Sequence, residues 1–403
     1  MKLHPPLVKG IVACLREIFG ENRYADKVIQ YQLKSHPKWG SRDRGFVAEN
    51  VYEIVRHWRL LRKLDGRRWD NDGKGTDDDL IRLLGINLLL KNQTLPQWAA
   101  FEGLSRNAIL KKKEKLIAER KIIRSIPDWL DETGIAELGG RWDSELAALN
   151  QPADVVLRTN LLKTTKYQLK KMLLREGWET TASPIAPAAL VLKKRGNIFS
   201  SPLFKKGLFE IQDAGSQRIA PFLKPEPGLR IVDACAGAGG KALHLATLME
   251  NKGHLIALDT AGWKLNELKK RARRNGIHII ETKTISSSKI VKRLHGSADR
   301  LLLDVPCSGL GVLRRNPDAK WKLSPQFLQR LKNTQAELLQ RYSSMLRPGG
   351  LMVYATCSIL PSENEEQVAL FLKNNPGFTL EEERTISPAK YGCDGFYMAR
   401  IKN

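Results

Sequence analysis

Two cysteines each stand at the end of an apolar run that is typical of a buried strand. Cys307 ends the segment RLLLDVPC (300–307), and Cys357 lies in GGLMVYATCS (349–358). Asp304 precedes Cys307 by three residues. A free cysteine is more often a buried apolar side chain than a nucleophile. Two thiols at two strand ends, with a carboxyl group near one of them in the sequence, nevertheless favour a covalent reaction.

Two thiols and an acid suit the modification of a pyrimidine ring. Carbon 5 of cytosine is a poor nucleophile, but it can attack an electrophilic methyl group once a thiolate has added to carbon 6. An acid hydrogen-bonded to N3 would favour that addition, because charge develops on the ring. A base must then remove the proton on carbon 5 so that the thiol can leave. We take this chemistry as the working hypothesis for these three side chains.

A glycine-rich loop, DACAGAGGK (233–241), follows another apolar run. Its glycines permit a tight turn and the close approach of a ligand, and the helix that begins behind them can receive a carboxylate or a phosphate. Asp259 ends the next apolar run, where an acidic side chain can accept both hydroxyls of an adenosine ribose. The glycine-rich turn alone is a weak signal, since NAD enzymes and plain turns share it. Together with Asp259 it predicts a nucleoside-containing ligand.

The elements that would position these residues begin near Leu229. From there, strands alternate with helices of 10–15 residues, which predicts an α/β domain with a parallel sheet covered on both faces. Ligands of such doubly wound sheets bind beyond the carboxyl ends of the strands, near the switch point of the strand order. The strands that we expect after the one at 229 cover 254–260, 277–284, 300–307 and 349–358.

Two further parts precede this domain. Residues 1–125 are expected to be helical, because apolar residues recur at helical spacing in 42–64 and the acidic loop 70–79 can cap a following helix. Residues 126–222 are expected to form a small α/β subdomain. The predicted domains are therefore 1–125, 126–222 and 223–403.

The charge of the chain indicates a polyanionic partner. The 403 residues carry 67 Lys and Arg against 43 Asp and Glu, a net charge of +24. Residues 1–150 contribute +6 of this surplus and residues 151–403 contribute +18. Nucleic acid is the first candidate partner and an anionic membrane the second, while plain solubility is the alternative explanation. In the helical part, a local basic patch is expected around Arg42 and Arg44.

Cysteine usage and hydropathy favour a cytoplasmic protein. Five cysteines are too few for a disulfide framework, and none has the spacing of zinc ligands. Cys14 and Cys235 are interpreted as packing residues. The N-terminal segment MKLHPPLVKG lacks the apolar core of a signal peptide, and no run approaches about 18 apolar residues. We expect a monomer with no metal and no membrane partner.

The motifs resemble those of the RsmB/Sun family of S-adenosylmethionine-dependent RNA cytosine-5 methyltransferases. The paired PC and TC motifs are highly specific to that family. SRDRGFVAENVYEIVR (41–56) further resembles the NusB-like helical RNA-binding domain of RsmB-type members. The segments that carry the resemblance are SIPDWL (125–130), LRTNLLKTT (157–165), GLFEIQDAGSQ (207–217), DACAGAGGK (233–241), LLLDVPCSGLGVLRRNPDAKW (301–321), YATCSILPSENEEQV (354–368) and DGFYMARI (394–401).

This resemblance implies a fold and a role for each matching residue. The fold would be a Rossmann-like class I methyltransferase domain behind a small α/β subdomain and an all-α NusB-like domain. Cys357 would attack carbon 6, Cys307 would assist release of the product, and Asp304 would contact the target base near the cofactor. Asp259 would bind the ribose, and Arg314 and Arg315 would contact RNA phosphates or be ordinary surface arginines. The loop around the methionine part of S-adenosylmethionine would comprise Cys235, Ala236, Gly237, Ala238, Gly239, Gly240 and Lys241.

The chain departs from the family pattern at two places. The loop usually reads CAAPGGKT, so Ala238 replaces a stiffening proline and Ala242 replaces a threonine. The third strand usually ends in an aspartate that contacts the adenine side, whereas this chain offers Thr284 or Ser286. The first departure leaves the loop more flexible, and the second leaves the adenine contact unassigned.

The sequence thus predicts an RNA cytosine-5 methyltransferase that acts on rRNA. Methylation of tRNA by the same chemistry is one alternative. A non-catalytic RNA-binding factor for ribosome assembly is another, which the altered loop favours and the two cysteines and two aspartates oppose. An NAD oxidoreductase would explain the glycine-rich turn but neither cysteine motif.

Overall fold

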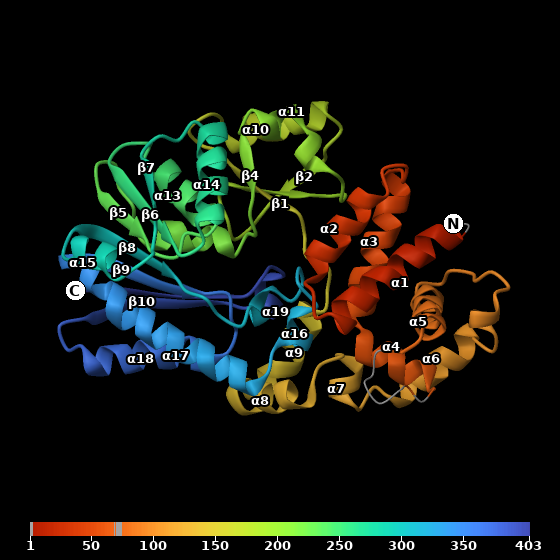
Figure 1. The fold of residues 1–403 in the computed structure, drawn as a ribbon. Coiled ribbons are helices and arrows are strands. Elements are labelled where there is room, and N and C mark those ends of the chain that lie inside the picture. The colour runs from red at the N-terminus through yellow and green to blue at the C-terminus, as the bar shows by residue number, and fades with distance from the viewer. Residues whose placement is uncertain (1–2, 68, 70–74) are drawn as a thin grey trace. The chain divides into compact units, whose positions relative to one another are not determined.

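The computed structural model describes residues 3–67, 69 and 75–403 (Figure 1). The chain forms two compact units. The first comprises Met1–Gln151 and Leu313–Ser324, and the second comprises Pro152–Val312 and Pro325–Asn403. This division differs from the boundaries expected at 125 and 222, which stay a prediction.

The described part of the first unit is helical, as expected. The predicted periodic segment 42–64 forms two helices, α3 and α4, which meet at His57. The loop before α5 caps that helix, because the Thr76 hydroxyl accepts from the Asp79 amide at 3.2 Å; residues 70–74 of the predicted loop lie outside the described residues. The helices are α1 (Pro5–Gly20), α2 (Ala25–Ser35), α3 (Ser41–Arg56), α4 (Trp58–Asp65), α5 (Asp77–Leu90), α6 (Arg106–Lys115), α7 (Arg120–Ile123), α8 (Asp128–Leu138), α9 (Trp142–Leu149) and α16 (Ala319–Lys322).

A short segment from late in the chain completes this first unit. Residues 313–324 follow the Cys307 motif in the sequence, yet they pack with helices of the N-terminal part. The Lys320 ammonium donates to the Arg56 carbonyl at 2.8 Å, and the Trp321 indole donates to the Val55 carbonyl at 2.8 Å. The Asp318 carboxylate accepts from the Ala25 amide at 3.0 Å. Polar groups of the segment therefore satisfy backbone groups of two N-terminal helices.

The second unit contains two sheets. A four-stranded antiparallel sheet has the order β2-β3-β1-β4, and a seven-stranded sheet has the order β10-β11-β9-β8-β5-β6-β7. The strands are β1 (Val156–Thr159), β2 (Thr180–Ala182), β3 (Ala189–Leu192), β4 (Phe209–Ile211), β5 (Arg230–Asp233), β6 (His254–Asp259), β7 (Ile280–Thr284), β8 (Ala298–Asp304), β9 (Leu346–Thr356), β10 (Thr379–Ile386) and β11 (Phe396–Lys402).

The larger sheet is doubly wound, which confirms the predicted fold class. Strands β5 to β9 are parallel, and the β10–β11 pair adds an antiparallel edge that the sequence did not predict. Side chains alternate between two cores, since Ile231 packs with α13 and α14 while Val232 packs with α15, α17 and α18. The helices of this unit are α10 (Lys166–Arg175), α11 (Pro202–Lys205), α12 (Ile219–Phe222), α13 (Gly240–Leu248), α14 (Gly262–Asn275), α15 (Lys289–Arg293), α17 (Pro325–Tyr342), α18 (Glu365–Asn374) and α19 (Pro388–Tyr391).

The strand order places the predicted site at the switch point of this sheet. The order runs outward from β5 to β6 and β7 on one side and to β8 and β9 on the other. The loops after β5 and β8 leave the sheet at this reversal, where doubly wound sheets bind their ligands. They carry the glycine-rich loop and the Cys307 motif.

Candidate active site at the ends of the parallel strands

The glycine-rich loop leaves open space beside the end of β5. Gly237 and Gly239 have φ values of +54° and +88°, which favour glycine. A Cβ atom at Gly239 would lie 2.4 Å from Leu268 Cγ, so the close packing of α14 requires glycine there. A Cβ atom at Gly237 or Gly240 would meet no atom within 4 Å. The loop therefore has a packed side and an open side, and a cofactor could lie along the open one.

Asp259 at the end of β6 supports this loop. Its Oδ2 accepts from the Gly237 amide at 2.9 Å, and its Oδ1 accepts from the Ala261 amide at 2.8 Å. An ionised carboxylate has about four lone-pair positions, so each oxygen retains one for a further donor. Asp259 can thus hold the loop and bind ribose hydroxyls at the same time.

Asp233, the last residue of β5, is fully buried beneath the loop. Burial raises the pKa of its carboxyl group to about 7, and the nearby charge of Asp304 adds to the effect. Close to neutral pH, this carboxyl group therefore holds its proton part of the time.

Asp304 at the end of β8 forms an ion pair with Lys241 at the start of α13. The Lys241 Nζ donates to Asp304 Oδ2 at 2.6 Å. Burial lowers the pKa of Lys241, but the charge and hydrogen bond of Asp304, together with the charges of Cys357 and Asp233, raise it above the ordinary value. The lysine therefore stays protonated, and this contact joins the glycine-rich loop to the Cys307 motif.

The two predicted cysteines lie side by side. Cys307 Sγ and Cys357 Sγ are 3.2 Å apart, and the Cys357 amide donates to Cys307 Sγ at 3.3 Å. The pKa of Cys307 lies well above its ordinary value, because of the hydrogen bond with Cys357, burial, and the charges of Cys357 and Glu363. Strands β8 and β9 are paired neighbours, so their ends bring the two motifs together.

A turn after β9 fixes both cysteine loops, and sequence reasoning did not identify it. Glu363 is fully buried and accepts from the Ser308 amide at 2.8 Å and from the Ser308 hydroxyl at 2.5 Å. Asn364 accepts from the Thr356 hydroxyl at 2.5 Å and donates to the Ser358 carbonyl at 3.2 Å. Two consecutive side chains therefore hold one neighbour of Cys307 and both neighbours of Cys357. Their motif, PSENEEQV, was visible in the sequence, but nothing in it indicated these partners.

A close contact between two glycines also supports Cys357. The Gly311 amide donates to the Cys357 carbonyl at 2.8 Å, and the Gly395 amide donates to the Gly311 carbonyl at 2.8 Å. A Cβ atom at Gly311 would lie 2.3 Å from the Gly395 carbonyl oxygen. A side chain at Gly311 would therefore displace the backbone that carries Cys357.

The structure places the two predicted RNA-contacting arginines with the first unit. Arg314 and Arg315 lie in the segment Leu313–Ser324, which packs with the N-terminal helices. Arg314 is 8% exposed, and its carbonyl accepts from the Arg56 guanidinium at 3.0 Å. A side chain so deeply buried offers little surface to a phosphate, whereas Arg315 is half-buried. An RNA contact by this pair stays a prediction.

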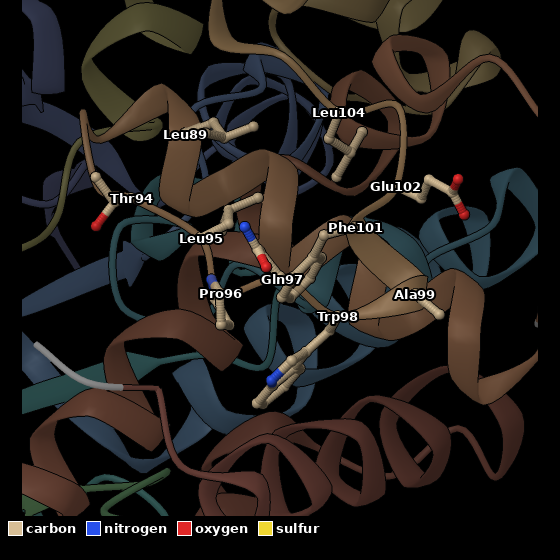
Figure 2. A pocket seen from close by; sticks show the side chains of 10 residues that line it. All are labelled: Leu89, Thr94, Leu95, Pro96, Gln97, Trp98, Ala99, Phe101, Glu102 and Leu104. Carbon is tan, nitrogen blue, oxygen red and sulfur yellow. The ribbon is translucent and has the colours of Figure 1, made fainter.

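A hollow elsewhere in the first unit contains none of the predicted site residues. It has a volume of about 650 Å³, and its wall includes Trp98 and Phe101, whose rings stack 5.5 Å apart (Figure 2). Glu102 is the charged residue in this wall. Across the described part of the chain, no helix combines the length and the apolar character needed to cross a membrane.

Comparison with known proteins gives concordant matches. The family model described as 16S rRNA methyltransferase RsmB/F matches residues 220–402, and the RsmF/B-like ferredoxin-like domain matches 126–199. The chain is 33% identical to a probable ribosomal RNA small subunit methyltransferase B of Synechocystis, over 96% of this chain and 97% of that protein. It is 33% identical to the ribosomal RNA small subunit methyltransferase B of Klebsiella pneumoniae, over 90% and 91%.

Solved structures share the fold. A methyltransferase homologue protein from Pyrococcus horikoshii is 27% identical, with a TM-score of 0.63 over 71% of this chain and 98% of that one. NSun6 from the same organism, solved with the S-adenosylmethionine analogue SFG, has a TM-score of 0.64 at 21% identity, over 70% of this chain and 99% of that one.

Proposed function

Because the chain belongs to the RsmB/F family of 16S rRNA methyltransferases, we propose that it methylates carbon 5 of a cytosine in small-subunit rRNA through a covalent bond to Cys357. Membership of the family confirms the resemblance inferred from the motifs and makes the chain an S-adenosylmethionine-dependent RNA methyltransferase. The observation that carries the finer proposal is the 3.2 Å separation of the Cys307 and Cys357 sulfur atoms at the ends of β8 and β9.

The glycine-rich loop and Asp259 would hold the cofactor. S-adenosylmethionine, when bound, supplies an electrophilic methyl group. Gly237 and Gly240 border the open side of the loop, and Asp259 retains lone pairs for the ribose hydroxyls. The N-terminus of α13 and the Lys241 ammonium favour a carboxylate nearby. The altered loop sequence therefore keeps the groups that a methionine-and-ribose ligand needs.

Cys357 would act on the target base with Asp304 and Lys241. Its thiolate adds to carbon 6 of cytosine, and the ring electrons become available at carbon 5. The Lys241 ammonium donates to Asp304 at 2.6 Å, and the Asp304 carboxyl group would contact N3 of the base, where charge develops.

Cys307 would assist the release of the product. When carbon 5 loses its proton, the bond from carbon 6 to Cys357 Sγ breaks, and the electron pair of that bond returns to the sulfur. Cys307 lies within hydrogen-bond distance of that sulfur. The raised pKa of Cys307 means that its thiolate, once formed, is a strong base for the carbon 5 proton.

The substrate must present an unpaired cytosine. Carbon 6 is inaccessible in a stacked helix, so the base has to be unpaired already or flipped out. The +18 surplus of residues 151–403 would hold the RNA backbone, with an affinity that falls as salt rises. We place this activity in the cytoplasm, where small-subunit rRNA is assembled, and expect the protein to act as a monomer.

Bisulfite mapping of methylated RNA tests the proposal. The purified chain, S-adenosylmethionine and unmethylated small-subunit rRNA should yield 5-methylcytosine at a defined position, and Cys357→Ala should yield none. A parallel reaction with a tRNA pool tests the main alternative. Methylation of tRNA alone, or of another ring atom, would contradict the proposal. If the chain binds both naked rRNA and ribosomal particles but methylates neither, a role as a non-catalytic assembly factor would be favoured.

A further inference from the structure

A basic hollow lined with tryptophan rings lies in the first unit beside α4. Its volume is about 650 Å³, which is in the range of cavities that hold small organic ligands. Three tryptophans and four Arg or Lys side chains lie in its wall, together with one aspartate. We infer that this hollow binds an unpaired stretch of the RNA substrate, with a base against the indole rings and phosphates against the basic side chains. The inference rests on the proposed function and adds a second RNA contact to it.

The tryptophan rings are fixed before any ligand arrives. Trp58 stacks on Phe19 with ring centroids 3.7 Å apart, and Trp69 meets Trp58 edge to face at 5.5 Å. The indole N–H of Trp321 is held by the Val55 carbonyl. Rings that are already ordered lose little conformational entropy when a base stacks on them. Base–aromatic stacking is a main source of affinity for single-stranded nucleic acids.

The basic side chains give the hollow a net positive charge. The guanidinium of Arg62 lies over the Trp69 ring, 4.5 Å from its centroid. Lys63 and Arg67 are exposed at the rim, and Arg67 lies 3.9 Å from Asp79. Asp128 offsets part of the charge, because it pairs with Arg59 at 2.9 Å. The remaining surplus favours a polyanion over an acidic or neutral small molecule.

Other features of the helical unit fit RNA less well. The hollow of Figure 2 has Glu102 as its charged wall residue, which would repel phosphates. The basic patch expected around Arg42 and Arg44 is weakened, because Arg44 donates to the carbonyls of Trp39, Leu33 and His36. Its guanidinium therefore closes the end of α2. Among the described residues of the helical unit, the wall of the hollow at α4 combines three tryptophan rings with more basic than acidic side chains.

The occupant should be single-stranded. In a duplex the base faces are stacked on one another, so the indole rings could not reach them. Splayed-out bases of loops, bulges and strand ends expose both faces. A preference for single-stranded over double-stranded RNA is therefore part of the inference.

Binding of a fluorescein-labelled, single-stranded ten-nucleotide oligouridine to the full-length chain tests this site. Trp69→Ala and the double variant Lys63→Glu/Arg67→Glu should each weaken binding roughly tenfold or more, whereas Trp69→Phe should retain most of the affinity because it keeps a ring. Lys111→Glu/Lys115→Glu on α6 is the control, since it makes the same charge change outside the hollow. Thermal unfolding of each variant shows whether the fold is kept.

Several results would overturn the inference. The inference is wrong if the hollow variants fold and bind oligouridine as tightly as the wild type. It is also wrong if the α6 control loses as much affinity as the hollow variants, or if the wild type binds a duplex that contains the same strand equally well. Methylation of small-subunit rRNA separates this inference from the proposed function. The hollow variants should raise KM roughly tenfold with kcat nearly unchanged. If the wild type methylates rRNA and the hollow variants have the same KM as the wild type, the inference about the hollow is wrong and the proposed function stands. If the wild type transfers no methyl group to rRNA, the proposed function is wrong, whatever the affinity for oligouridine.

Discussion

Glu363 provides the sharpest test of how the two cysteines are held. The side chain is fully buried, and its oxygens accept from the Ser308 amide, the Ser308 hydroxyl and the Gln335 amide at 2.8, 2.5 and 2.9 Å. Ser308 follows Cys307 directly, so these bonds determine the position of the Cys307 loop. We compare Glu363→Ala, which removes the acceptors, with Glu363→Gln, which keeps an acceptor oxygen and removes the charge.

Glu363→Ala should lose more stability than Glu363→Gln. In Glu363→Ala, the Ser308 amide loses its acceptor, and the Gln335 amide keeps only its bond to the Pro306 carbonyl. Each buried donor without a partner costs about 1–3 kcal/mol, so the loss should be about 2–6 kcal/mol, a large part of the stability of a typical domain. Glu363→Gln retains an oxygen for both amides and loses mainly the charge assistance, so we expect about 1–2 kcal/mol. Urea unfolding followed by circular dichroism measures both values.

The charge of Glu363 should also appear in the pH dependence of product release. It is one of the causes that raise the pKa of Cys307, after the Cys357 hydrogen bond, burial and the Cys357 charge. In Glu363→Gln the pKa of Cys307 should therefore fall. Because the Cys307 thiolate is the proposed base, the release rate should increase with pH, and this increase should occur at lower pH in the variant. Single-turnover decay of the protein–RNA adduct, measured between pH 6 and pH 10, gives this profile.

Two results would refute the reasoning. Equal unfolding midpoints for the Ala and Gln variants would mean that the three hydrogen bonds do not hold the loop. A release profile of Glu363→Gln that coincides with the wild type would mean that the charge does not act on Cys307. Glu365→Gln is a useful control, because it makes the same charge change at a nearby acid that accepts from the Thr385 hydroxyl.

Four further predictions concern single residues of the site. Cys357→Ala should abolish methyl transfer with RNA affinity nearly unchanged, and turnover by this variant would contradict the role of Cys357. Cys307→Ala should accumulate a protein–RNA adduct, visible as a slow band on a denaturing gel. The absence of this adduct would contradict the role of Cys307. Asp259→Ala should weaken S-adenosylmethionine binding roughly tenfold or more in calorimetry, because charge-assisted bonds to the loop and the ribose are lost; unchanged affinity would remove Asp259 from the cofactor site. Asp233 has a pKa of about 7 when folded and an ordinary, lower value when unfolded, so its contribution to stability is present at low pH and is lost as the pH rises from about 4 to 7. Asp233→Asn should therefore be more stable relative to the wild type at pH 8 than at pH 4, and a pH-independent difference in urea unfolding would contradict this.

The sequence predicted the parts of the site that depend on local pattern. Continuous apolar runs identified β8 and β9, and the residues after them are Cys307 and Cys357. Strand alternation then implied a parallel sheet, whose carboxyl ends face one edge, so the proximity of the two motifs was predictable. The separation of 3.2 Å between the sulfur atoms was not, because it depends on side-chain packing.

The features that the sequence did not reveal depend on contacts between distant residues. Glu363 lies 55 positions from Ser308, and Lys320 lies 264 positions from Arg56. No periodicity or motif connects such pairs. Arg314 and Arg315 were expected to contact RNA because they follow the PC motif, but the position of their segment is set by its packing with the N-terminal helices. The strands β10 and β11 were missed because the α/β alternation ends before them.

The return of residues 313–324 to the first unit has a consequence for biosynthesis. An N-terminal domain usually folds while the rest of its chain is still being translated. Here Trp321, Lys320 and Asp318 reach the ribosomal exit only after more than 160 residues of the second unit have followed Gln151. At about 5–20 residues per second, the nascent helices wait roughly 10–35 s for that segment. During this time the backbone groups that it satisfies are open to water or to a chaperone, and a truncated 1–151 fragment would remain in that unfinished state.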